Sequence, residues 1–224
     1  MRGTGRRLLW RAIPVGLVAL ALLLWAGMRW SRDPAAPAAD TAGFHGATLT
    51  PEPAPPIALI DHRGREFDLH AQVQQGNVVL LFFGYTSCPD VCPMTLSHHK
   101  QVKQILGEHA ARVQFVMVSV DPERDTRERM RRYVEAFDPE FIGLTGTLDE
   151  LRPIWEAYGV KPEKEEIPGS ALGYAVTHPA FTYVVDRSGN LRLIHFLGTA
   201  PDAVAEDLVK LLSEPLPRGA REAA

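Results

Sequence analysis

Two apolar runs, at residues 78–85 and 113–120, constrain the fold more than any other feature of the chain. A strand that reads as a run of apolar residues, without regular alternation, is typical of a sheet that is covered on both faces. Helical patterns follow the two runs, at residues 93–107 and 125–137. This repetition of strand and helix predicts an α/β architecture.

The remaining segments complete a mixed sheet. Turn signals predict two hairpins, over 57–69 and 181–196, and the last helix is expected at 203–212. A short strand is expected at 141–144 and a helix at 148–158. This order predicts a thioredoxin-like fold over 57–213, with an added N-terminal β-hairpin and an insertion before the last two strands. Ligands of α/β sheets bind at the carboxyl ends of the strands, so the loop after residue 85 is the expected site.

A transmembrane anchor is predicted at residues 12–30. Residues 12–28 carry no charge and would extend about 25 Å as a helix. Four arginines precede them, and this charge bias places residues 1–11 in the cytoplasm and the rest of the chain outside. The alternative is a cleaved signal peptide with a small-x-small site at 36–38, but charged residues separate that site from the apolar stretch. The excess of 19 arginines over 5 lysines favours a bacterial source. We therefore expect an inner-membrane protein with a periplasmic C-terminal domain.

Proline-rich composition sets residues 31–56 apart, and it predicts a semi-rigid tether that forms no core. Residues 214–224 are expected to be a disordered tail. The formal charge of −3 divides unequally between the ends of the chain. Residues 1–30 hold five arginines and no acid, and the rest holds 19 basic against 27 acidic residues, a net charge of −8. A body this acidic is not expected to bind nucleic acid.

The chain's two cysteines, Cys88 and Cys92, lie in the loop that reads GYTSCPDVCP. The following helix should begin near Cys92, and its positive end should make both thiols more acidic than free cysteine. A structural disulfide would close a short loop and would stabilise little. Two active roles remain, thiol–disulfide exchange and binding of a soft metal. Two thiolates and one imidazole suit copper, as Cu(I) or Cu(II), whereas structural zinc takes four ligands.

Three of the eight histidines are candidates for a third ligand. His98 and His99 lie six and seven residues after Cys92, some 9–10 Å along the helix, which is too far to share a metal. We expect them to be a solvated or loop-facing pair. His178 lies in the connection that enters the predicted strand at 181–185. In a thioredoxin-like fold this connection abuts the cysteine loop, but a lone loop histidine is more often a surface residue, so the residues alone leave both roles open.

The cysteine loop resembles the signature of the Sco/SenC family of copper chaperones for cytochrome c oxidase assembly. Further matches are VSVDPERDT at 118–126, GLTGT at 143–147, and His178 five residues before Tyr183. The resemblance covers about residues 57–212.

The resemblance implies that Cys88, Cys92 and His178 bind copper in a thioredoxin-like fold. The chain departs from the family pattern at Pro179, where family members more often carry serine or threonine. Proline favours an extended backbone at His178, which leaves the ligand geometry open. Pro179 could also take the part of the cis-proline that thioredoxins place near their cysteines.

Charged residues are expected near the site. Asp121, Arg124 and Asp125 follow the second buried run at the same edge of the sheet as the cysteine loop. Asp125 is predicted to cap the helix that follows it. Asp90, between the cysteines, could shape the field at a metal or face a partner.

The function that the resemblance implies is a membrane-tethered metallochaperone, a binding and transfer module rather than an enzyme. It would exchange copper with other copper chaperones and deliver it to the binuclear copper site of cytochrome c oxidase subunit II. The alternative is a membrane-anchored thiol–disulfide oxidoreductase that reduces the target cysteines before metallation. Cys88 and Cys92 would then be its catalytic, redox-active pair, able to form a disulfide. A peroxiredoxin-like peroxidase is a weaker alternative, because Thr86 lies two rather than three residues before Cys88 and the expected proline is missing.

Overall fold

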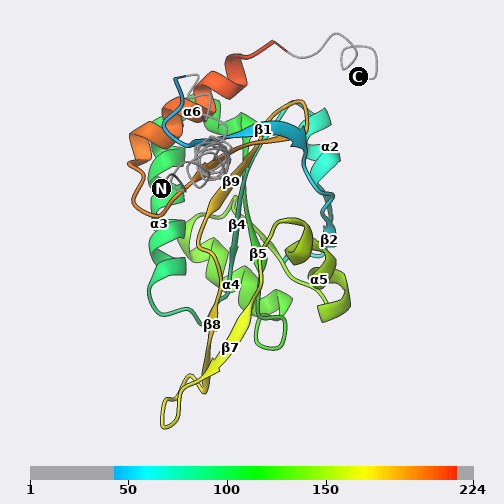
Figure 1. The fold of residues 1–224 in the computed structure, drawn as a ribbon, viewed down its shortest axis with the longest axis vertical. Coiled ribbons are helices and arrows are strands. Elements are labelled where there is room, and N and C mark those ends of the chain that lie inside the picture. The colour runs from blue at the N-terminus through cyan, green and yellow to red at the C-terminus, as the bar shows by residue number, and fades with distance from the viewer. Residues whose placement is uncertain (1–42, 216–224) are drawn as a thin grey trace, which may run out of the picture. The chain divides into compact units, whose positions relative to one another are not determined.

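A six-stranded mixed sheet forms the centre of the molecule (Figure 1). The computed structural model describes residues 43–215, which belong to one compact unit. The strand order is β1–β10–β9–β4–β5–β6. The strands are β1 (Ala47–Pro53), β4 (Val78–Gly84), β5 (Val113–Ser119), β6 (Ile142–Leu144), β9 (Thr182–Val185) and β10 (Asn190–His195).

The two apolar runs form the middle of this sheet, as predicted. β4 pairs in parallel with β5, from Val78 opposite Val113 to Gly84 opposite Ser119. β6 is parallel to β5, whereas β9 is antiparallel to β4 and β10 is antiparallel to β9. All seven residues of β4 are buried, because helices cover both faces. Burial of each large apolar side chain contributes about 1.5–3 kcal/mol.

Helices lie on both sides of the strands (Figure 1). α3 (Val91–Leu106) packs against α6 (Pro201–Ser213) on one side, and α2 (Leu69–Gln74) and α5 (Leu148–Ala157) lie on the other. α4 (Arg127–Phe137) packs on β6 and also contacts α3. Alternate side chains of β4 serve the two faces: the Phe82 ring contacts His99 of α3, and the Phe83 ring contacts Tyr158 after α5. These elements agree with the predicted order.

Two hairpins lie outside the main sheet. The predicted N-terminal hairpin is confirmed, with β2 (Ala58–Ile60) antiparallel to β3 (Glu66–Asp68). The predicted insertion is a second hairpin, in which β7 (Glu163–Glu166) pairs with β8 (Tyr174–Thr177). Figure 1 shows it projecting beyond the ends of β4 and β5. The strand β8 leads directly into His178.

The predicted tether was wrong for its last part. Residues of β1 pair with β10, from Ala47 opposite Ile194 to Pro53 opposite Asn190, with an irregularity between Thr48 and Glu52. Prolines are tolerated there because β1 is an edge strand, in which one row of N–H groups has no partner strand. Ala54, the next residue, is buried. The folded body therefore begins before residue 47 rather than at 57.

The predicted tail was wrong for its first residue. Glu214 caps the end of α6 and is ion-paired to Arg192 at 2.8 Å. The predicted anchor at 12–30 lies outside the described residues, as do residues 216–224. Within residues 43–215 no helix has the length and apolar character that a membrane span requires.

Candidate metal centre

The cysteine loop joins the end of β4 to the start of α3. Cys92 is the second residue of α3, as expected, and its side chain is fully buried, whereas Cys88 in the loop is half-buried. The Cys92 backbone N–H donates to the sulfur of Cys88 across 3.4 Å. Both cysteines are free in this structure. The accessible sulfur is therefore that of Cys88.

The two thiols differ in acidity. Hydrogen bonds from the Cys92 thiol and from the backbone N–H groups of Cys92 and Asp90 lower the pKa of Cys88 to about 5, against the opposing effect of burial. The pKa of Cys92 is raised, because its thiol donates to Cys88 and lies in the interior. The prediction of an acidic thiol is confirmed for Cys88 and wrong for Cys92. At neutral pH the pair is one thiolate and one thiol.

Gly84, the last residue of β4, makes room for the buried sulfur. A Cβ atom at this position would lie 2.5 Å from Cε1 of Phe82 and 3.1 Å from Sγ of Cys92. Real Cβ atoms essentially never approach other atoms to the first of these distances. Any larger residue at this position would displace the Phe82 ring and press on the sulfur of Cys92.

His178 lies beside this loop, as predicted. Its ring is edge-on to those of Phe82 and Tyr85, with centroids 6.4 and 6.1 Å away. Its Nδ1 lies 2.9 Å from the carbonyl oxygen of Pro179. Since a carbonyl only accepts, Nδ1 carries the hydrogen and Nε2 keeps the lone pair that a metal would bind. Burial lowers the pKa of His178, which favours the neutral imidazole. The peptide bond to Pro179 is trans, because the described residues contain no cis peptide.

Tyr85 connects the histidine segment to the cysteine loop. Its hydroxyl accepts the N–H of Val176 in β8 across 3.3 Å, and a hydrogen bond from it also favours the Cys88 thiolate. The structure thus brings Cys88, Cys92 and His178 to one edge of the sheet. The three side chains are not close enough to bind one metal ion together. Across residues 43–215, no three histidine, cysteine or carboxylate side chains are.

Asp125 binds the start of the cysteine loop and does not cap α4. Its carboxylate accepts the N–H and hydroxyl of Thr86, at 3.1 and 2.6 Å, and the hydroxyl of Ser119 at 2.7 Å. The helix cap is Thr126, whose side chain accepts the N–H of Arg129. The predicted cap was wrong because Thr126 supplies the oxygen at the helix end, while the Asp125 side chain is directed into the interior. Burial raises the pKa of Asp125.

The comparison with protein families decides the identity of this domain. The model of the SCO1/SenC family matches residues 47–213, which includes β1. The chain belongs to the SCO1/SenC family. The SCO2-like protein RC0895 of Rickettsia conorii is 32% identical over 150 residues, which is 67% of this chain and 72% of that protein.

Solved structures of the family agree with the fold. Apo Sco1 of Thermus thermophilus is 41% identical, with a TM-score of 0.66 over 75% of this chain and 96% of that one. Bradyrhizobium japonicum ScoI, solved with copper bound, is 34% identical, with a TM-score of 0.64 over 71% of this chain and 99% of that one. The predicted thioredoxin-like fold is thereby confirmed.

The adjacent histidines of this SCO1/SenC domain do not form a solvated pair. His99 is fully buried, and its Nε2 lies 3.1 Å from the hydroxyl of Thr182. Burial lowers the pKa of His99 to about 3. His98 is half-buried, and its Nε2 lies 2.7 Å from the carbonyl oxygen of Thr199. The expectation was wrong for His99, because its ring lies against Phe82 of β4 and Phe115 of β5, inside the core. Neither residue lies among the three predicted ligands.

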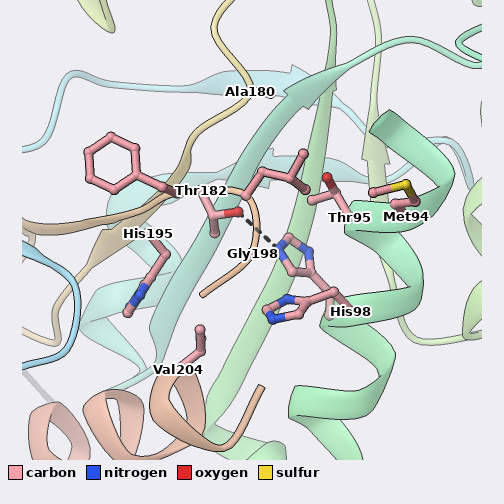
Figure 2. Close-up of a pocket in the computed structure, with 11 residues that line it drawn as sticks. Met94, Thr95, His98, Ala180, Thr182, His195, Gly198 and Val204 are labelled. Carbon is pink, nitrogen blue, oxygen red and sulfur yellow. Dashed lines mark hydrogen bonds between the residues drawn. The ribbon is translucent and has the colours of Figure 1, made fainter. Parts of the chain in front are cut away.

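A cavity of about 240 Å³ lies on this side of the cysteine loop (Figure 2). Met94 and His98 come from α3, whereas Thr182 and His195 come from the facing strands. The lining is mostly apolar. His195 is part of it, and its Nε2 lies 3.5 Å from the carboxylate of Asp207, which is not part of the lining. Met94 and Ala180 in its lining follow Cys92 and His178 by two residues each, but none of the three predicted ligands lines the cavity.

Proposed function

We propose that this protein is a copper-binding metallochaperone that holds copper with Cys88, Cys92 and His178. Proteins of the Sco family act in cytochrome c oxidase assembly. The copper-bound ScoI structure, at 34% identity, supports copper as the ion. The donor set supports it independently, because two soft thiolate sulfurs and a borderline imidazole nitrogen suit Cu(I) and tolerate Cu(II).

The pairing of a thiolate at Cys88 with a free imidazole lone pair at His178 carries this proposal. The ionised thiolate of the half-buried Cys88 would bind an incoming ion first. The buried thiol of Cys92 must lose its proton before it can join, so loading releases a proton. Nε2 of His178 then completes the set from the facing segment. An ion held by ligands from two segments can leave by exchange, as the sulfurs and imidazoles of an acceptor replace these three one at a time.

We propose that the acceptor is the binuclear copper site of cytochrome c oxidase subunit II. We also propose that residues 12–30 anchor the chain in a bacterial inner membrane, with this domain in the periplasm, where it receives copper from other chaperones. The apolar stretch between arginines and the family resemblance support this arrangement. The net charge of −8 beyond residue 30 speaks against a nucleic-acid partner.

Anaerobic titration of the reduced 224-residue chain with Cu(I), against a chromogenic competitor, tests the proposal. We expect one Cu(I) per chain. Cys88→Ala and Cys92→Ala should abolish competitive binding, and His178→Ala should weaken it by roughly 10–100-fold. His70→Ala is the matched control, since His70 is an exposed histidine on α2. Unchanged affinity in His178→Ala would remove it from the ligand set.

The unequal thiols also support the second function, a thiol–disulfide oxidoreductase. The Cys88 thiolate would attack a target disulfide and form a mixed disulfide while one target thiolate leaves. Deprotonated Cys92 would then attack Cys88, which releases the second target thiolate and leaves a Cys88–Cys92 disulfide. Two electrons pass from the pair to the target, which ends as a dithiol. This function would replace the first if the cysteine variants lost disulfide reduction but kept copper affinity.

A further inference from the structure

Arg124 joins the turn after β5 to the hairpin that carries His178. Its Nη1 donates to the carbonyl oxygens of Leu172 and Tyr174, at 2.9 Å each. Its guanidinium carbon lies 3.7 Å from the centroid of the Tyr174 ring and 5.6 Å from that of Tyr85. One side chain thus contacts the start of β8 and the tyrosine of the cysteine loop.

Asp121 holds this arginine in place. Its carboxylate pairs with Nε of Arg124 and also accepts the hydroxyl of Tyr174 across 2.8 Å. The Asp121 side chain is fully buried and that of Arg124 is 17% exposed, so solvent screens the pair little. Arginine suits this place because its planar fork can pair with a carboxylate, donate to carbonyls and stack on a ring at the same time.

The hairpin shares no strand pairing with the main sheet, although Val176 of β8 is buried in the core. β7 and β8 pair with each other in a separate two-stranded sheet, and all four residues of β7 are exposed. Lys164 of β7 pairs with Glu123, in the same turn as Arg124. Further along β8, the N–H of Val176 donates to Tyr85. His178 stands four residues after Tyr174, about 13 Å along an extended chain, so a shift at the start of β8 is passed on to the histidine.

We propose that Arg124 is a positioning residue for His178. By fixing the start of β8 against the turn after β5, it sets where the imidazole stands relative to Cys88 and Cys92. This inference rests on the proposed function, in which His178 is a copper ligand. Arg124 itself touches neither the ion nor the two sulfurs; it acts through the strand.

A double-mutant cycle in the reduced 224-residue chain tests this role. Arg124→Met removes the fork and retains an apolar side chain. We expect it to weaken Cu(I) binding by roughly tenfold or more, the usual effect of losing a residue that orients a ligand. In the His178→Ala background it should cause no further loss, because its effect passes through the histidine. Equal losses in both backgrounds would overturn the proposal.

Arg192 provides the matched control. It is 19% exposed, pairs with Asp186 and Glu214, and lies 5.9 Å from the centroid of the Phe44 ring. Arg192→Met should therefore cost comparable stability but leave Cu(I) affinity unchanged. Arg124→Lys keeps the charge without the fork, and we expect it to restore only part of the affinity. Full restoration by lysine would show that charge alone is needed, which would contradict positioning by the fork.

NMR of the copper-free chain separates this inference from the proposed function. The ring protons of His178 should show nuclear Overhauser contacts to Tyr85 in the wild type and in Arg192→Met, and these contacts should weaken in Arg124→Met. Retained contacts in Arg124→Met would overturn the positioning role. A wild type that bound no copper would overturn the proposed function, while the loss of these contacts would still establish what Arg124 does.

Discussion

The backbone N–H of Cys92 donates to the sulfur of Cys88 across 3.4 Å, at the first turn of α3. The hydrogen bond from the Cys92 thiol to the Cys88 sulfur, with this backbone contact beside it, makes the two cysteines chemically unequal. The end of α3 and the hydrogen bond from the Cys92 thiol both stabilise negative charge on the sulfur of Cys88. The Cys92 thiol stays protonated because it donates this hydrogen bond and is buried.

Alkylation should therefore select Cys88. With a pKa of about 5, its thiolate persists from neutral pH down to that value and is lost as the pH falls below it. We expect the iodoacetamide rate of the reduced, metal-free chain to rise with a midpoint near pH 5 and to map to Cys88 by mass spectrometry. Cys92→Ser, which changes the donor, should move the midpoint upward. A midpoint near that of free cysteine would contradict the assignment.

Gly84→Ala should disturb the metal centre through Cys92. The new methyl group would overlap Phe82 and press on Sγ of Cys92, at a cost of about 1–3 kcal/mol in the free energy of unfolding and a loss of Cu(I) affinity. Gly143→Ala is the control, because its Cβ would lie 2.3 Å from Cγ of Met130, away from the cysteines. Urea unfolding should show destabilisation of both variants, and Cu(I) titration should separate them. Equal affinities in the two variants would argue against this role of Gly84.

Asp125→Ala should loosen the cysteine loop. It leaves the N–H and hydroxyl of Thr86 and the hydroxyl of Ser119 without their acceptor, which costs about 1–3 kcal/mol for a buried group. Amide exchange at Thr86 should accelerate. Thr126→Ala, which removes the helix cap, should cost about 1 kcal/mol without changing exchange at Thr86. Slow exchange at Thr86 in Asp125→Ala would show that the loop has other sufficient support.

Acid should destabilise the fold partly through His99. Its pKa is lowered to about 3 in the folded protein by burial, against 6.5 for an ordinary histidine, so the unfolded chain binds a proton that the folded chain refuses. Stability should therefore fall as the pH drops from about 6.5 toward 3. In His99→Gln the slope of the unfolding free energy against pH should be smaller between these values. The difference corresponds to at most one proton, about 1.4 kcal/mol per pH unit. An unchanged slope would mean that other groups carry the acid sensitivity.

Much of the fold could be predicted because its signals are local. The apolar runs that became β4 and β5, the turn residues of two hairpins and the cysteine loop each carry their own pattern. The prediction of a tether through Pro51 and Pro53 was wrong, because composition does not distinguish a tether from an edge strand that tolerates proline. The hairpin of β7 and β8 gave no apolar signal, since all of β7 is exposed.

The site could be predicted only in part. The family resemblance singled out Cys88, Cys92 and His178 as the proposed ligands, but the contacts of Tyr85, Arg124 and Asp125 join distant segments and carry no local pattern. The run VSVDPERDT marked the place of the last two without showing that Asp125 turns toward Thr86 and Arg124 toward β8. Adjacent candidates for a cap, Asp125 and Thr126, are equally suitable by residue type, and only the direction of each side chain separates them.

The pairing of β1 with β10 also limits how far this domain could travel. The backbone N–H groups of His45 and Gly46 donate to Asp207 of α6. The chain is therefore bound to the folded domain from residue 45 onward. If residues 12–30 are an anchor, as proposed, at most residues 31–42 can separate it from the described body, rather than 31–56. This would reduce the maximum reach from roughly 80 Å to roughly 40 Å at about 3.1 Å per residue. The volume searched shrinks roughly tenfold, and the local concentration of the domain at the membrane surface rises accordingly. A connection this short would favour acceptors that are themselves bound to the membrane over diffusible ones.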